Sequence, residues 1–119
     1  MTNNQDINNL MVNQFANLTL DRQWIHTDVE KASKLMPQTG TIVHGYFTMS
    51  MLAHLMHDVL SKNLPESHTS KIKSIINYGI NKLRFTDMVP VGSSIRAHVT
   101  LNAAEENEKG TQITYGVTI

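Results

Sequence analysis

The hydrophobic pattern of this chain changes period, from helical spacing in the first half to strict alternation near the end. After Pro90-Val91-Gly92, which predicts a turn, every second residue is apolar. The apolar positions are Ile95, Ala97, Val99, Leu101 and Ala103, with Arg96, His98, Thr100 and Asn102 between them. Beyond the polar stretch 105–110 a second alternating run has Ile113, Tyr115, Val117 and Ile119 on one face. Alternation predicts strands with one buried face, so we expect an antiparallel hairpin.

The first half has apolar residues three and four apart. They are Ile7, Leu10, Met11, Phe15 and Leu18, and they predict a helix of about three turns with Asp6 as its N-cap. A second short helix is predicted from Asp28 to Met36, because Pro37 prevents its continuation. The segment from Leu20 to Thr27 breaks the helical period, and we interpret it as an irregular connector.

The stretch 43–60 is apolar around most of a helix, and such a helix must be enclosed by other elements. The polar stretch 61–70 predicts a solvated connection, and 77–85 predicts an earlier strand with weaker alternation. Helices followed by antiparallel strands indicate one α+β domain spanning residues 1–119, with residues 1–5 flexible. An antiparallel sheet wrapped around a central helix, the hot-dog fold, fits this order.

The predicted sheet has few strands, and the alternation is still running at Ile119. Three strands leave two edges with unpaired backbone groups, which proteins usually cover with further strands or a second subunit. We therefore expect an incomplete sheet in a truncated domain or, as the preferred interpretation, a homodimer.

The composition excludes several classes of partner. Ten basic and ten acidic side chains cancel without a dense basic run, so we expect neither nucleic acid nor a membrane surface as a partner. The chain has no cysteine, and its polar first residues do not resemble a secretory signal, so a cytoplasmic location is expected. A small-molecule ligand without a cofactor is the preferred expectation.

Asp21 and His26 are the candidate catalytic pair. On a continuous helix, five residues would separate them by about 140°, so they converge only if Gln23 and Trp24 form a turn. A carboxylate beside an imidazole can activate water, as addition of water to a conjugated thioester requires. On the residues alone, Asp21 as a helix cap or turn residue and His26 as a partly buried, paired histidine are the favoured interpretations.

Gly45 is the candidate oxyanion residue. The thioester oxygen gains negative charge during hydration, and backbone N–H groups at the start of a helix can stabilise it. Gly45 lies at the start of the predicted central helix, where the lack of a side chain lets a thioester approach the backbone.

The segment from Phe15 to His26, FANLTLDRQWIH, followed by Ala32, resembles the hydratase-2 motif of R-specific enoyl-CoA hydratases and MaoC-like dehydratases. IVHG at 42–45 resembles the start of that family's central helix, and NYG at 77–79, LRF at 83–85 and VPVG at 89–92 resemble its next strand and turn. The Gln23-Trp24 variant points to the branch similar to nodulation protein N. The resemblance covers about 7–119 and implies a hot-dog fold, Asp21 and His26 as the catalytic pair, and Gly45 in the oxyanion site. It also implies a coenzyme A or acyl-carrier-protein thioester as substrate.

Three features depart from the family pattern. Leu20 stands where the family usually has glycine beside the aspartate, the strand before the first helix has almost no room, and the final strands are cut short. A hot-dog thioesterase and a non-catalytic acyl-thioester binding module therefore stay open as alternatives.

Other polar residues have simpler interpretations. His44 is expected to fix the entry of the helix rather than to take part in catalysis. His54 and His57 share a helix face at a spacing suited to metal ligands, but no third ligand is evident, so we expect no metal site. Lys82 and Arg84 are more simply a solvated face than a contact for coenzyme A phosphates.

Overall fold

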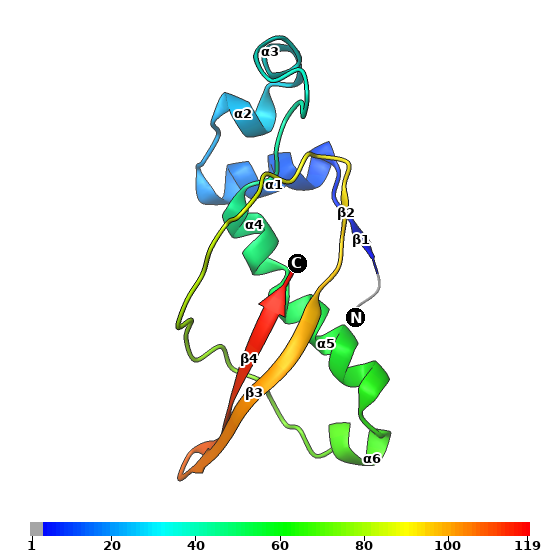
Figure 1. The fold of residues 1–119 in the computed structure, drawn as a ribbon, viewed down its shortest axis with the longest axis vertical. Coiled ribbons are helices and arrows are strands. Elements are labelled where there is room, and N and C mark those ends of the chain that lie inside the picture. Colours follow the sequence, from blue (N-terminus) through cyan, green and yellow to red (C-terminus); the bar gives the residue numbers. More distant parts are fainter. Residues whose placement is uncertain (1–3) are drawn as a thin grey trace.

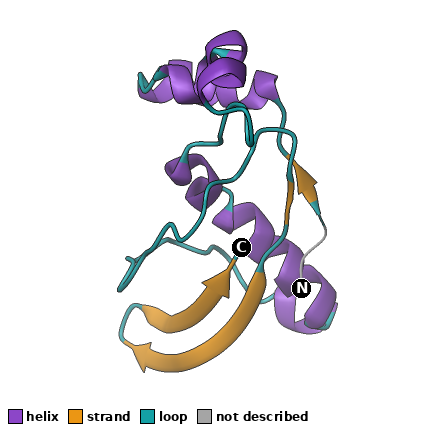
Figure 2. Ribbon diagram, turned by 45° about the horizontal axis from the view of Figure 1, so that its top comes forward, coloured by secondary structure: helices purple, strands orange, loops and turns teal. Residues whose placement is uncertain are grey.

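The computed structural model describes residues 4–119, except for the side chains of residues 68 and 69. The molecule is elongated, measuring 53 × 25 × 24 Å, with the first helices at one end and a β-hairpin toward the other (Figure 1). A helical column joins the two ends, and long loops connect the elements (Figure 2). The predicted α+β class is therefore confirmed.

A short strand precedes the first helix. Strand β1 (Gln5–Asp6) pairs antiparallel with β2 (Ser94–Ile95), with Gln5 opposite Ile95. The strand that was expected to have almost no room is only two residues long. Residues 1–3 of the segment predicted to be flexible lie outside the described residues. Ile7 continues the extended path, because its N–H donates to the carbonyl of Ser93 at 3.0 Å and its side chain is fully buried.

Helix α1 (Asn9–Thr19) begins two residues later than predicted. Its N-cap is Asn8, whose side chain accepts a hydrogen bond from the N–H of Met11 at 3.0 Å. The predicted cap, Asp6, is wrong because that residue belongs to β1. The helix ends at Leu20, which has the left-handed φ of 65°.

Two short helices follow the Asp21 turn. Helix α2 (Trp24–Thr27) lies inside the connector that was predicted to be irregular from Leu20 to Thr27. Only residues 20–23 of this connector are irregular. Helix α3 (Val29–Leu35) confirms the second predicted helix. The Asp28 side chain caps it by accepting a hydrogen bond from the N–H of Lys31 at 2.9 Å.

The predicted central helix consists of α4 (Gly45–Ser50) and α5 (Leu52–Asn63). Met51 joins them with nearly helical dihedral angles, and its N–H donates to the carbonyls of Phe47 and Thr48, both at 3.2 Å. A further turn, α6 (Glu66–Thr69), occupies part of the stretch predicted to be a loop. Only Phe47 and Leu55 of α4 and α5 are buried, so this single chain covers one side of the helical column.

The predicted hairpin is confirmed. Strands β3 (His98–Asn107) and β4 (Gly110–Thr118) pair antiparallel, and the predicted loop 105–110 shortens because β3 continues to Asn107. A register shift between Leu101 and Ala103 interrupts the ladder. The predicted buried face is wrong for much of the hairpin, because Leu101, Ala103 and Ile113 are exposed. The predicted strand 77–85 is wrong: this segment is extended without ladder bonds, because no strand of the described chain lies alongside it.

The core joins the first helices to the turn before β2. Its buried members are Ile7, Val12, Val43, Phe47, Leu55, Ile95 and Ala97. Backbone hydrogen bonds from Val43 to Val89, 2.7 Å, and from Val91 to Thr41, 2.9 Å, hold the approach to α4 against residues 89–91. No helix within residues 4–119 combines the length and apolar character needed to cross a membrane.

Candidate active site

The turn that carries Asp21 is built from the end of α1. The Thr19 hydroxyl donates to the carbonyl of Phe15 at 2.8 Å and lies 3.4 Å from the Asp21 N–H. Leu20 then takes its left-handed conformation and sends the chain away from the helix axis. The chain turns again before Trp24, where α2 begins, so Asp21 and His26 belong to different elements, as their convergence requires.

His26 is held in one orientation by the backbone. Its side chain is 7% exposed, and Nδ1 lies 2.6 Å from the carbonyl oxygen of Ile42. A carbonyl only accepts hydrogen bonds, so the neutral ring carries its proton on Nδ1 and donates it to Ile42. The Ile42 N–H in turn donates to the Ile25 carbonyl at 2.9 Å. The free lone pair of His26 is therefore on Nε2.

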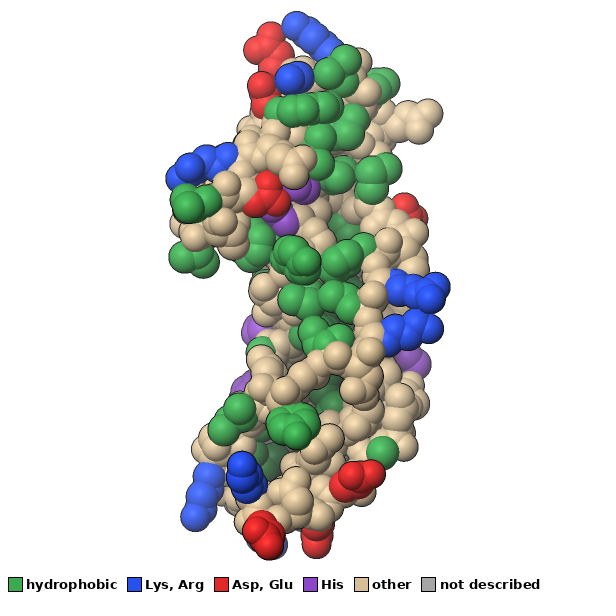
Figure 3. Space-filling view, turned by 90° about the vertical axis from the view of Figure 1, so that its left-hand side faces the viewer, with side chains coloured by type: hydrophobic (Ala, Val, Ile, Leu, Met, Phe, Trp, Pro, Cys, Tyr) green, Lys and Arg blue, Asp and Glu red, His purple; other side chains and the backbone are tan. Residues whose placement is uncertain are grey.

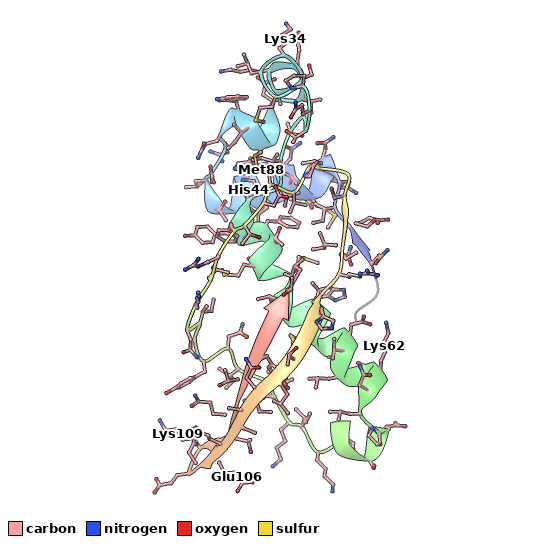
Figure 4. All side chains as sticks on the ribbon, in the orientation of Figure 1. Lys34, His44, Lys62, Met88, Glu106 and Lys109 are labelled. Atoms are coloured by element: carbon pink, nitrogen blue, oxygen red, sulfur yellow. The ribbon has the colours of Figure 1, made fainter. Side chains whose placement is uncertain are left out.

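His44 connects the two candidate catalytic residues. The side chain is 3% exposed, and Nε2 lies 2.9 Å from the backbone carbonyl oxygen of Asp21. The His44 ring stacks on the His26 ring with centroids 3.8 Å apart and planes 23° from parallel, and Phe15 contacts it at 4.9 Å. Figure 4 shows His44 at the start of α4, close to Met88.

The structure brings Asp21, His26 and His44 together. One polar side-chain atom from each of them lies within 4.8 Å of those of the other two. The upper part of Figure 3 shows acidic and histidine side chains side by side at the surface. Two groups at this separation can hold one water molecule between them, because each hydrogen bond to it spans about 2.8 Å.

The same cluster is a poor fit for a metal ion. An imidazole binds a metal along a lone pair in its own ring plane, at about 2 Å. The stacked rings of His26 and His44 lie in nearly parallel planes, so one ion would lie far from at least one of the planes. His26 Nδ1 and His44 Nε2 are in addition engaged with carbonyl oxygens.

Gly45 follows His44 as the first residue of α4. Its N–H has no acceptor within the described residues, as expected for the first N–H of a helix. The exposed ring of Phe85 lies directly over the glycine: a Cβ built on Gly45 would stand 3.0 Å from two of its ring carbons. Phe85 also meets Tyr46 edge to face at 5.9 Å. The predicted oxyanion residue thus has an N–H without an acceptor in the described part of the chain, and an exposed aromatic ring packs against its Cα.

The contacts of His44 with Asp21 and His26, and of Phe85 with Gly45, were not predicted from the sequence. His44 was expected only to fix the helix entry, and its position next to Gly45 was the available signal. Phe85 was assigned to a strand. Both contacts join segments far apart in the chain, and alternation or helical spacing does not reveal such contacts.

The remaining polar candidates lie elsewhere. His54 and His57 are exposed on α5, and Lys82 and Arg84 are exposed in the extended segment. A surface hollow of about 510 Å³ lies at the far end of α5, where His57 and Leu64 line it. It has no lining residue in common with the Asp21 cluster.

The family model of the MaoC-like domain matches residues 2–119. The chain belongs to the MaoC-like dehydratase family. The hot-dog fold of this family accounts for the helical column beside antiparallel strands. In the described residues these strands form two two-stranded sheets.

Characterised relatives agree with this assignment. The MaoC-like chain is 41% identical over 109 residues to 3-hydroxyacyl-thioester dehydratase Z of Mycobacterium tuberculosis, covering 91% of this chain and 67% of the relative. It is 30% identical over 109 residues to nodulation protein N of Rhizobium leguminosarum bv. viciae, covering 91% of this chain and 64% of that protein. A nodulation protein N of Rhizobium meliloti is 30% identical over 114 residues, or 95% of this chain and 67% of its own length.

Proposed function

We propose that this MaoC-like chain is a hydratase or dehydratase that interconverts trans-2-enoyl thioesters and (R)-3-hydroxyacyl thioesters. The observation that carries the proposal is the convergence of Asp21 and His26, from different elements, on His44. The next residue in the chain, Gly45, has an N–H without an acceptor within the described residues. The name of the Mycobacterium tuberculosis relative, a 3-hydroxyacyl-thioester dehydratase, supports the reaction class.

In the hydration direction, one water molecule bridges the Asp21 carboxylate and His26 Nε2. Nε2 is the ring nitrogen without a proton, so it takes a proton from this water as the water oxygen bonds to C3 of the enoyl group. The carboxylate accepts the second hydrogen bond of the water and orients it. The proton on Nε2 then passes to C2, so one molecule of water has been added across the double bond.

Gly45 stabilises the charge that develops between these steps. When oxygen adds to C3, electron density moves to the thioester oxygen until C2 is protonated. The free Gly45 N–H donates to that oxygen, and removal of a comparable donor in other enzymes lowers the rate about 10²- to 10³-fold. Phe85 must move or pack against the thioester for this contact to form.

The direct test is to mix the protein with crotonyl-CoA and follow the loss of the conjugated-thioester absorbance, with chiral analysis of the product. His26→Asn is the sharpest variant, because the asparagine amide can replace Nδ1 as the donor to Ile42 but has no counterpart of Nε2. We expect a folded protein with activity reduced by about 10²- to 10⁴-fold. No turnover by the folded wild type, or full activity of His26→Asn, would refute the proposal.

The same samples separate the alternatives. A thioesterase would release free thiol from saturated acyl-CoA, and a binding module would show saturable heat of binding without conversion. Parallel assays with coenzyme A and acyl-carrier-protein thioesters identify the carrier.

We also propose that the active form is a homodimer. Large apolar side chains, including Tyr46, Ile76 and Tyr78, are exposed to solvent in the single chain. Burying such surface on a second copy would stabilise both. Sedimentation equilibrium tests this directly, and a monomer with full activity would exclude it.

A further inference from the structure

We propose that His44 is a positioning residue, which holds the Asp21 turn and the His26 ring in the arrangement that activates water. The kinetic part of this inference rests on the proposed hydratase function. His44 itself contacts none of the reacting atoms, and it acts through Asp21 and His26, which do contact them.

The first observation is the hydrogen bond to Asp21. The Asp21 carbonyl can only accept, so His44 Nε2 carries the proton and donates it at 2.9 Å. The other hydrogen bonds that Asp21 itself makes within the described residues are local and longer: 3.4 Å from its N–H to Thr19 Oγ1 and 3.5 Å from the Gln23 N–H to its Oδ1. The turn also includes Leu20 in a left-handed conformation that L-residues disfavour. A buried donor from another element therefore has a specific part in keeping Asp21 in place.

The second observation is the ring stack. His44 lies face to face with His26 at 3.8 Å, while Phe15 packs against His44 from α1. The bond from His26 Nδ1 to Ile42 fixes one point of the His26 ring but leaves rotation about that bond. The flat contact with His44 restricts this rotation, and so directs Nε2.

The third observation is position in the chain. His44 immediately precedes Gly45, so the residue that holds Asp21 and His26 is also attached to the proposed oxyanion donor. The positions of the Asp21 carboxylate, the His26 ring and the Gly45 N–H, which would all contact one substrate, thus depend on this one buried side chain. A displacement of 1 Å between such groups can lower a rate about 10²-fold.

His44 Nδ1 makes the test selective. This nitrogen is buried and has no hydrogen-bond partner among the residues that the structure describes, whereas Nε2 is the donor that the inference requires. Glutamine can place an N–H near the position of Nε2, while asparagine reaches only near that of Nδ1. Phenylalanine preserves a flat ring without any donor.

The experiment compares His44→Gln, His44→Asn and His44→Phe by steady-state kinetics on crotonyl-CoA, with thermal melts as a control for folding. We expect kcat to fall about 10- to 100-fold in the Asn and Phe variants with KM within about twofold, and Gln to recover most of the loss. Equal losses in Gln and Asn, or losses expressed mainly in KM, would overturn the inference.

A spectroscopic measurement keeps the inference testable without turnover. In ¹⁵N-labelled wild type, ring-nitrogen shifts should identify the Nε2–H form of His44 and the Nδ1–H form of His26. The Arg22 amide, which follows the Asp21 carbonyl, should shift in the Asn and Phe variants and stay near its wild-type position in Gln. If wild type does not turn over but these spectra are as expected, the proposed function fails and the positioning role stands. An Nδ1–H form of His44 would overturn that role.

Discussion

The region before residue 60 and the region after residue 70 differ in how many of their apolar side chains are buried. Seven of the nine buried apolar residues, among them Ile7, Val12 and Leu55, come from the first region. The second contributes only Ile95 and Ala97, while Ile75, Ile76 and Tyr78 are exposed in its extended segment. The candidate site lies in the packed region. The candidate site and most of the core thus share one part of the chain, and the other part presents surface that a partner could cover.

The largest effect is expected from a substitution in the packed region, at Asp21. Asp21→Asn should lower kcat/KM on crotonyl-CoA by about 10²- to 10⁴-fold, because the amide cannot act as the charged acceptor for the bridging water. The matched control is Glu105→Gln, which makes the same change from carboxylate to amide at an exposed position on β3. Comparable losses in both variants would remove the distinction between the regions.

A pair of truncations compares the packing of the two regions. Leu55 is 1% exposed and Ile76 is 83% exposed. Leu55→Ala should lower the free energy of unfolding by about 2 to 5 kcal/mol, and Ile76→Ala by less than about 0.5 kcal/mol in the monomer. Denaturant titrations at several protein concentrations provide the measurement. A cost for Ile76→Ala that grows with concentration would place this side chain in a subunit interface.

Gly45 and Phe85 form a contact between the two regions. In Gly45→Ala the new methyl group meets the Phe85 ring at 3.0 Å, so the ring must shift and the substrate loses room at the helix start. We expect kcat/KM to fall about tenfold, the effect of roughly 1.4 kcal/mol on the barrier. Gly79→Ala is the control, since its Cβ would meet nothing within 4 Å. An unchanged rate in Gly45→Ala would show that this approach is not used.

The smallest expected effect concerns Leu20. Leu20→Gly should raise the free energy of unfolding by about 0.5 to 1 kcal/mol, because glycine adopts the φ of 65° without steric cost. The same change at Leu18, an exposed position inside α1, should lower it by about 1 kcal/mol. Thermal melts of the two variants should therefore move in opposite directions; a shift in the same direction would contradict the strain at Leu20.

The sequence predicted the parts of the fold that depend on local pattern. The second helix and the final hairpin are confirmed because the effect of proline and the alternation of apolar residues act within a few residues. The Asp6 cap and the 77–85 strand are wrong because their outcome depends on distant partners: Asp6 pairs with the segment near residue 94, and 77–85 has no adjacent strand in the described chain.

In the candidate site, too, the features set by local sequence were predicted and those set by distant contacts were not. Asp21, His26 and Gly45 were selected by their motif, and the turn at Gln23-Trp24 was required by their spacing. The stack of His44 on His26 and the Phe85 ring over Gly45 were not foreseen, since tertiary packing determines both. The catalytic roles themselves stay predictions until the assays are done.

The pairing of β1 with β2 has a consequence for the order of folding. Gln5 lies opposite Ile95, so the first strand has no partner until most of the chain has been synthesised. The helices can form from local contacts within microseconds, whereas closing so long a loop is slower. Ile7, fully buried beside this pairing, would remain solvated until then. A nascent chain would therefore carry a formed Asp21 turn before its N-terminal strand is paired.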